Sequence, residues 1–380
     1  MTATPLWSYG VLVVAVLAMS SGGVWFALLT ETPPLMQACW RLVLTVALQL
    51  GGFVHELRTD PSLDAAFWRR FWRSSPLLLT IGLALGVHFG SWGWSVAHTS
   101  LLDSLLLVCS TPLLLVVIMT LRWLYRRHDT STTVVHLARE SDRLLDSITT
   151  AADDGASWFR TVVCPKISLP PTLHEAIGAL VGFAGVIVLL ATSTERSVHQ
   201  VTLAGNAAAL LGALAILVYL EGGAGCRKWM PLFVYALPVT AIAALELAIA
   251  SLVFEAHTTI GGVGPTALFG FLGDGRRFGL AFGAAAVSGL LGHTCANLAV
   301  KYVSPLLISV AVLWEPLLGS VMGYMVGVQG PPDASAVIAA PLLLGGALLV
   351  TLGGRRVITA KDEPKQVDDR RTDDRVALSA

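Results

Sequence analysis

Apolar segments long enough to cross a lipid bilayer recur along almost the whole of this chain. A membrane-spanning helix needs about 20 predominantly apolar residues, and ten segments meet this requirement. Only 13% of the residues are charged, whereas a soluble domain carries about 25%. We therefore expect an all-α, polytopic membrane protein with ten transmembrane helices. The predicted spans are Trp7–Leu29, Leu35–Val54, Pro76–Ala97, Leu101–Leu121, His174–Ser193, Leu203–Gly222, Pro231–Phe254, Gly279–Val300, Ser304–Gly327 and Ser335–Gly353.

The first apolar segment has a secretory signal peptide as its alternative interpretation. No basic residue precedes Trp7, and the run Trp7–Leu29 is longer than the apolar core of a signal peptide. We therefore expect this segment to be the first span.

Lysine and arginine residues are distributed unequally between alternate loops. With ten spans, 21 of the 25 Lys and Arg residues fall on one side, Arg196, Arg276 and Arg277 fall on the other, and Arg41 lies inside the second span. Cytoplasmic loops carry an excess of Lys and Arg, so we expect both termini to be cytoplasmic. The sequence does not indicate which membrane holds the protein.

Two segments differ from the spans in composition. The loop 123–172 is rich in Ser, Thr, Asp and Arg, and its stretch Val134–Ile148 has apolar residues at helical spacing. That stretch is either an amphipathic helix or part of a solvated insertion. The tail 354–380 is polar and charged, a composition typical of a disordered segment.

The two halves of the chain resemble each other. The stretch 98–112 matches the stretch 302–316 at an offset of 204 residues, and each holds a polar break followed by a span with an internal proline. Further along, the double proline at 170–171 matches the one at 331–332, so the offset falls to 161. The difference of 43 residues is close to the length of the loop 123–172, which we interpret as an insertion into the first half.

These matches predict two repeats, 7–193 and 203–353, each with five spans. An odd number of spans places the second repeat in the membrane with the opposite orientation. Inverted repeats are typical of secondary transporters, whose solute site lies where the halves meet.

Several short motifs then resemble the EamA-like branch of the drug/metabolite transporter superfamily. They are the prolines and arginine of Pro33–Arg41, the turn Ala299–Pro305, the pair Glu315-Pro316 and the glycines Gly345-Gly346. The long insertion and the segment Ser110-Thr111-Pro112, which has no glutamate, depart from the family pattern. The resemblance implies a ten-helix transporter of a small metabolite or drug-like solute that works by alternating access. It implies no particular substrate; proton coupling and exchange both stay open.

Ionisable side chains inside spans are costly and usually face a cavity or a partner. Arg41 lies about two turns into the second span, where its guanidinium would bind a carboxylate or phosphate through two hydrogen bonds. The alternative is a structural or snorkelling arginine. Glu315 lies near the middle of the ninth span, where it would attract a cation or carry a coupled proton. The alternative is a glutamate that braces the chain at Pro316.

Polar residues also share helix faces in the third and eighth spans. His88 and Trp92 are four residues apart, as are His293 and Asn297, so each pair lies on one face. Because the two spans hold equivalent places in the two repeats, we expect these residues to face one cavity. For each of them, packing within the bundle is the alternative. Pro112 and Pro316 are expected to kink their helices.

Other kinds of function lack a signal. The chain has no H-E-x-x-H or G-x-S-x-G motif and no phosphate-binding loop, so we do not expect an enzyme or an ATP-driven pump. A transporter-derived receptor or scaffold that acts through the loop 123–172 is the main alternative. The expected partners are a small-molecule solute and membrane lipid, with a homodimer left open. The five scattered cysteines and the zero net charge predict no metal or other cofactor and no nucleic-acid partner.

Overall fold

The computed structural model describes residues 5–126, 171–192, 201–299, 302, 311–332 and 334–353. These residues are all-helical, without a strand, and include nine helices long and apolar enough to cross a membrane. The all-α and multi-pass parts of the prediction are thus confirmed. The predicted ninth span lies partly outside the described residues. The segment Val134–Ile148, most of the predicted insertion and the tail 354–380 lie outside them altogether.

The nine candidate spans correspond to predicted spans one to eight and ten, although some are assembled from shorter helices. The elements are α1 (Leu6–Ser20), α2 (Gly22–Leu28), α3 (Pro34–Thr59), α4 (Ala65–Arg73), α5 (Ser75–His98), α6 (Leu101–Val108), α7 (Thr111–Arg126), α10 (Leu173–Ala191), α11 (Leu203–Trp229), α12 (Leu232–Phe254), η1 (Gly270–Gly273), α13 (Gly275–Gly283), η2 (Ala284–Thr294), α14 (Cys295–Ala299), α16 (Glu315–Val326) and α17 (Ala334–Gly353). The described part of the ninth span is α16.

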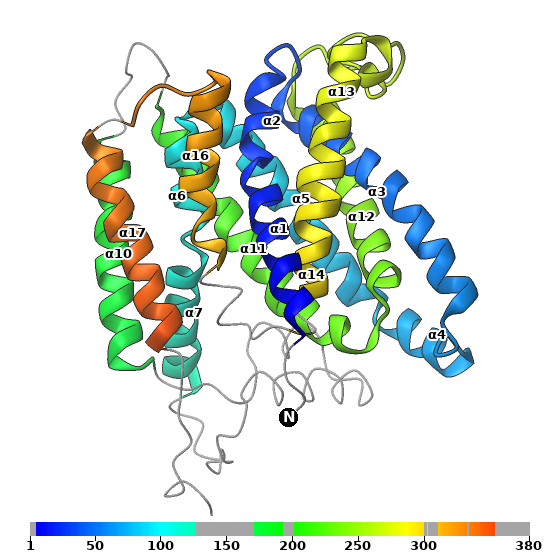
Figure 1. Cartoon of the computed structure of the whole chain (residues 1–380), viewed down its shortest axis with the longest axis horizontal. Helices are drawn as coiled ribbons and strands as arrows, with labels where there is room; N and C mark the ends of the chain where they lie inside the picture. Colours follow the sequence, from blue (N-terminus) through cyan, green and yellow to red (C-terminus); the bar gives the residue numbers. More distant parts are fainter. Residues whose placement is uncertain are drawn as a thin grey trace, which may run out of the picture.

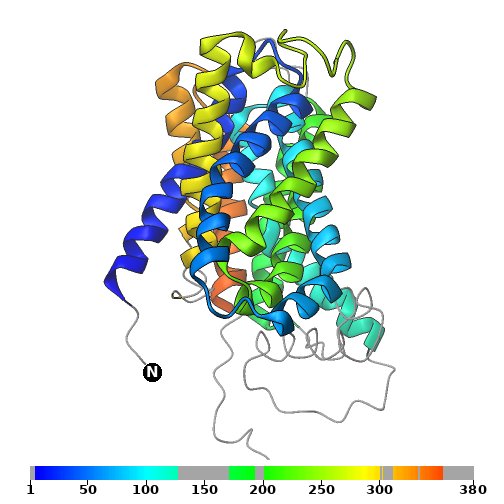
Figure 2. The ribbon, with the colours of Figure 1, turned by 90° about the vertical axis from the view of Figure 1, so that its right-hand side faces the viewer.

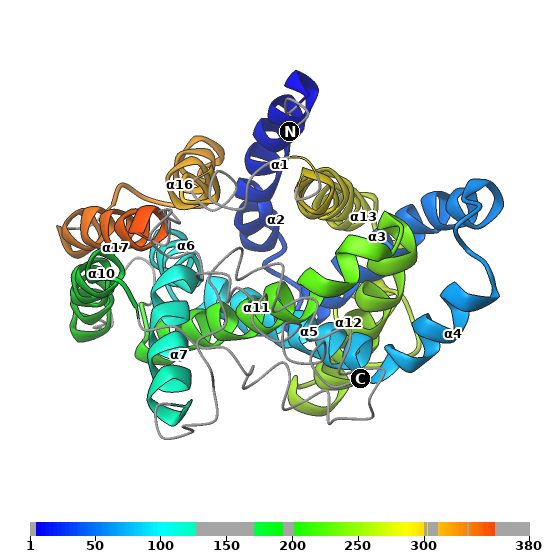
Figure 3. The same cartoon turned by 90° about the horizontal axis from the view of Figure 1, so that it is seen from below.

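The long helices run side by side in one bundle (Figure 1, Figure 2). Helices α10 and α17 pack against each other at one edge, and α4 lies at the opposite edge (Figure 3). Between them, α5 packs against α11 and α12, and α12 packs against α3. Short α4 lies at one end of the bundle, whereas the start of α13 lies at the other (Figure 1).

Helices α3 and α12 cap each other with glutamates. The first N–H groups of a helix have no partner within that helix, and a carboxylate is favoured beside them. Glu255, which follows α12, accepts hydrogen bonds from the backbone N–H groups of Leu35 (2.6 Å) and Met36 (3.1 Å). Glu56, near the end of α3, accepts from Phe233 (2.8 Å) and Val234 (2.9 Å) at the start of α12. The two helices are therefore fastened at both ends.

Glycines allow other helices to approach closely. Gly346 of α17 is buried against the backbone of Gly178 and Gly182 in α10. Gly82 and Gly86 of α5 lie against α12, where their nearest neighbours are the side chains of Ile242 and Glu246. Small residues at such positions let helix backbones come into van der Waals contact within a membrane, so these glycines are explained by packing.

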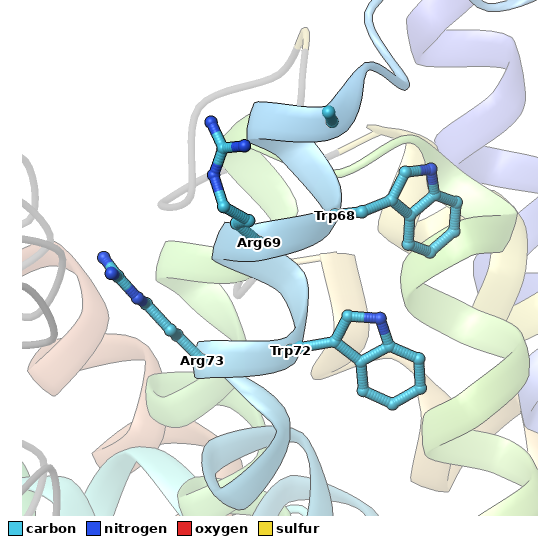
Figure 4. Close-up of a pocket in the computed structure, with 5 residues that line it drawn as sticks. Trp68, Arg69, Trp72 and Arg73 are labelled. Carbon is cyan, nitrogen blue, oxygen red and sulfur yellow. The ribbon is translucent and has the colours of Figure 1, made fainter.

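The short helix α4 carries different side chains on its different faces. Asp64 caps it by accepting a hydrogen bond from Phe67 N. Phe67 and Phe71 are buried, whereas Trp72 is 67% exposed. The side chains of Trp68 and Trp72 project to one side of the helix, and those of Arg69 and Arg73 project to the other (Figure 4). Together with Ala65, these four residues line a shallow surface hollow.

Candidate functional site

Arg41 places a positive charge in the interior of the bundle. Its side chain, on α3, is 1% exposed. The guanidinium carbon lies 4.3 Å from the centre of the Phe89 ring and 5.9 Å from those of Phe26 and Trp92. A cation over an aromatic face is stabilised by the charge distribution of the ring. The arginine therefore lies in an aromatic enclosure formed by side chains of α2 and α5.

The hydrogen bonds of Arg41 are incomplete. Nη2 donates to the hydroxyl of Ser288 in η2 at 2.9 Å. Within the part of the chain that the structure describes, Nε and Nη1 have no hydrogen-bond acceptor. A guanidinium has five N–H donors in a planar fork, so most of this fork is free to bind another group.

A small cavity lies beside Arg41. Its volume is about 30 Å³, room for about two water molecules. Helices α3, α5, α11, α12, η2 and α14 all contribute to its wall. The polar and aromatic lining residues are Arg41, Thr45, Gln49, Phe89, Tyr219, Thr240, His293, Thr294 and Asn297.

The element η2 is a π-helix, in which backbone hydrogen bonds join residues five apart. Its wider turn is accompanied by a bond from the Thr294 hydroxyl to the carbonyl of Gly289, at 3.4 Å. Such elements are rare and frequently occur at functional sites. Here η2 holds Ser288 against Arg41 and also contributes His293 to the cavity.

His293 and Asn297 both line the cavity, as the sequence predicted for one face of the eighth span. The His293 ring meets Phe89 edge to face, with 5.3 Å between centres. Asn297 donates a hydrogen bond from Nδ2 to the Tyr219 hydroxyl at 3.1 Å. This bond connects α14 to α11 across the cavity.

His88 and Trp92 lie next to the cavity rather than in its described lining. His88 Nδ1 is 2.9 Å from the carbonyl oxygen of Gly212, which can only accept, so this nitrogen carries a proton in that contact. The His88 and Trp92 rings are stacked with 6.4 Å between centres, and Trp92 packs against Phe26. Phe89, which lies between His88 and Trp92 in the sequence, is the aromatic residue of α5 that lines the cavity.

Glu315 is the first residue of α16 and is partly buried. Its charge interacts with that of Arg41, although no ion pair joins these two described residues. A carboxylate at the start of a helix is also favoured by the helix dipole. Glu315 therefore lies near Arg41 but makes no direct contact that would neutralise the guanidinium charge.

Each of the two predicted kink prolines lies in the first turn of a helix. Pro112 is the second residue of α7, which follows α6 after a break at Cys109 and Ser110, and Pro316 is the second residue of α16. Proline is tolerated in a first turn because the N–H it lacks would have no partner there. At both positions a new helix begins, and α6 packs against α16.

Several lining residues were not singled out from the sequence. Thr45 and Gln49 follow Arg41 by four and eight residues, so helical spacing alone could have identified them. Ser288 precedes His293 by five residues, a spacing that becomes informative only when the helix is known to be π-helical. Phe89 has no polar atom to distinguish it from a packing residue.

The described residues contain no group of three His, Cys, Asp or Glu side chains placed to hold a metal ion.

No protein-family model and no curated protein matches the chain. A solved crystal structure, described only as that of a protein, aligns with 91% of this chain and 96% of its own at 16% identity and a TM-score of 0.49. This likeness is too distant to name a family.

Proposed function

We propose that this chain is a secondary transporter that moves a small metabolite or drug-like solute across its membrane by alternating access. The observation that carries the proposal is the buried Arg41 with its free donors, beside a polar cavity inside a bundle of apolar helices. An ionisable residue kept inside such a bundle usually marks a solute or ion pathway. We further propose that the protein is an EamA-like member of the drug/metabolite transporter superfamily.

The pattern of helix contacts supports the proposed inverted repeat. If the helices of the first half are exchanged for their counterparts in the second, the pairs α3–α12 and α10–α17 each exchange within themselves. The same exchange turns α5–α11 into η2–α1, and all these pairs are in contact. The mutual glutamate caps of α3 and α12 obey the same symmetry. In inverted-repeat transporters the solute binds between the halves, and the cavity is lined by α3 and α5 of the first half and by α11, α12, η2 and α14 of the second.

The cavity volume fits a closed state of such a cycle. About 30 Å³ is far less than the 300–1,000 Å³ of a typical ligand pocket. Uptake of a solute would therefore require the helices around the cavity to part, and the coupling to protons or to an exchanged solute would act at that step.

The proposal is tested by uptake into proteoliposomes. A mixture of amino acids, nucleosides, sugar phosphates and organic cations is offered with and without a pH gradient, and the contents are analysed by mass spectrometry. We expect at least one solute to accumulate, and Arg41→Gln to reduce its uptake at least tenfold. The matched control is Arg276→Gln, because Arg276 is an exposed arginine at the start of α13 that does not line the cavity. A protein that is folded and reconstituted but moves none of these solutes would contradict the proposal.

A further inference from the structure

The positive charge of Arg41 lacks a compensating partner. Burial of an ion in a protein interior is costly unless a counter-charge and hydrogen bonds offset the lost hydration. In the described structure the guanidinium has no carboxylate in direct contact; it meets the Ser288 hydroxyl and aromatic ring faces, and two of its nitrogens have no acceptor. A bound group that carries negative charge and accepts hydrogen bonds would supply what this site lacks.

The surroundings of Arg41 are suited to an anion rather than to a cation. The cavity beside it is lined with groups able to donate hydrogen bonds, among them the side-chain amides of Gln49 and Asn297. No carboxylate is among the lining residues. A cationic solute in this cavity would meet the guanidinium charge at short range with no acidic group of the lining to offset the repulsion.

We propose that Arg41 is the anchor of an anion-binding site that holds the carboxylate or phosphate of the solute, with Ser288 positioning the guanidinium. This inference rests on the proposed transport function and adds the chemical class of the solute. The planar fork of arginine matches both anions with two parallel hydrogen bonds. The Ser288 bond uses one hydrogen of Nη2. The other Nη2 hydrogen and the parallel N–H of either Nε or Nη1, neither of which has an acceptor, form the pair of donors left for the ligand.

Glu315 has a defined place in this scheme. In its ionised form, its carboxylate would offset part of the Arg41 charge at longer range while the anion is absent. A bound anion would make the direct contact with Arg41 that Glu315 does not make, and it would repel the Glu315 carboxylate. Loss of the Glu315 charge should therefore tighten anion binding, whereas loss of the Arg41 charge should abolish it.

The test measures the thermal unfolding of the purified protein in detergent. The probes are sodium phosphate and sodium succinate, compared with sodium chloride and tetraethylammonium chloride at equal ionic strength. We expect phosphate or succinate to raise the Tm of the wild-type protein in a saturable way, Glu315→Gln to saturate at a lower concentration, and Arg41→Gln to lose the saturable part. Phosphate also stabilises proteins non-specifically, and that part should persist in Arg41→Gln.

Arg227 provides a matched control. It is also a buried arginine beside aromatic rings, those of Tyr219 and Tyr235, and its Nε likewise has no acceptor. Unlike Arg41, it does not line the cavity, and its Nη1 and Nη2 both donate hydrogen bonds, to the Tyr235 hydroxyl at 3.4 Å and to the Leu220 carbonyl at 2.8 Å. Arg227→Gln should lower the Tm without changing the saturable response to anions. If Arg41→Gln does not fold, Arg41→Lys retains the charge without the fork and should bind the anions several-fold more weakly.

The possible results separate this inference from the proposed function. A saturable response that is equal in the wild type and in the Arg41 variants, or one produced by tetraethylammonium alone, would overturn the anion site. Uptake of only neutral or cationic solutes would also overturn it and would leave transport standing. Anion binding that depends on Arg41, in a protein that moves no solute, would support the site and contradict transport.

Discussion

At the scale of single residues, Glu255 links helix capping to pH. Burial raises the pKa of its carboxyl above the ordinary value, and the hydrogen bonds from Ser251, Leu35 and Met36, which lower that pKa, offset only part of the effect. A group whose pKa is raised by folding contributes stability that is present below its ordinary pKa and lost as the pH rises through the folded-state value. The capping hydrogen bonds themselves favour the carboxylate, but burial outweighs them, so the net contribution of Glu255 to stability is larger when its carboxyl is protonated.

We expect the free energy of unfolding of the wild type, relative to Glu255→Gln, to fall as the pH is raised through the carboxyl range. Glutamine is similar in size and does not titrate, so the difference between the two proteins cancels the titration of all other groups. Unfolding in detergent at a series of pH values measures it. A difference that grows with increasing pH would contradict this prediction.

The residues of the site show what a sequence can and cannot supply. Arg41 and Glu315 could be singled out because a charged group inside an apolar segment needs a partner or a cavity. His293 and Asn297 could be placed on one face by helical spacing. Ser288 could not, because the π-helix changes which residues share a face. Phe89 could not be identified, because its role depends on the Arg41 guanidinium that lies over its ring.

At the scale of helices, the contact between α10 and α17 depends on the absence of a side chain at Gly346. A Cβ atom there would collide with the backbone of Gly178 and Gly182, which cannot move aside as a flexible side chain can. Gly346→Ala is therefore expected to destabilise the protein by about 1–3 kcal/mol. Gly345, its neighbour, has open space around it.

Gly345→Ala is accordingly the matched control, and it should leave stability unchanged or raise it by up to about 1 kcal/mol, because alanine favours the helix. Chemical unfolding in detergent micelles measures both variants. Equal effects of the two substitutions would show that the close contact between α10 and α17 is not required.

Substitutions on the buried and on the exposed face of α4 should differ in their effect on stability. Phe71 is 9% exposed and belongs to the main apolar core, whereas Trp72 is 67% exposed. Removal of a buried phenylalanine ring costs about 3–5 kcal/mol, and an exposed substitution usually changes stability by no more than about 0.5 kcal/mol. We expect Phe71→Ala to cost about 3 kcal/mol and Trp72→Ala about 0.5 kcal/mol or less in detergent. The reverse order would mean that Trp72 packs inside the protein.

The existence of the helices was easier to predict than their interruptions. Spans such as Pro231–Phe254 agree closely with α12 because twenty apolar residues leave few alternatives. The break before α7 was expected only as a kink at Pro112, since a proline is compatible with a bend and with a new first turn. The π-helix could not be predicted, because it results from packing rather than from composition.

At the scale of the whole molecule, the two ends of the bundle carry different numbers of basic residues. The short helix α4, with Arg69, lies at the end opposite to the start of α13, with Arg276 (Figure 1). Both side chains are exposed. The excess of basic residues at the α4 end makes it the proposed cytoplasmic end.

We expect Arg69→Cys and Arg276→Cys to react with a membrane-impermeant thiol reagent from opposite sides of the membrane. Each is placed in a variant whose five native cysteines are replaced by alanine or serine. In intact cells only Arg276→Cys should be labelled, and opening the cells should expose Arg69→Cys. Labelling of both from the same side would be incompatible with the proposed topology.

The mutual caps of α3 and α12 have a consequence for how the protein is assembled. Glu56 belongs to the first predicted repeat and caps a helix of the second, and Glu255 returns the contact. A chain that stopped after its first half would leave the start of α3 without its acceptor and Glu56 without its donors. The caps of α3 and α12 therefore form only when both halves are present, so the first half cannot complete its hydrogen bonds until the second has been synthesised.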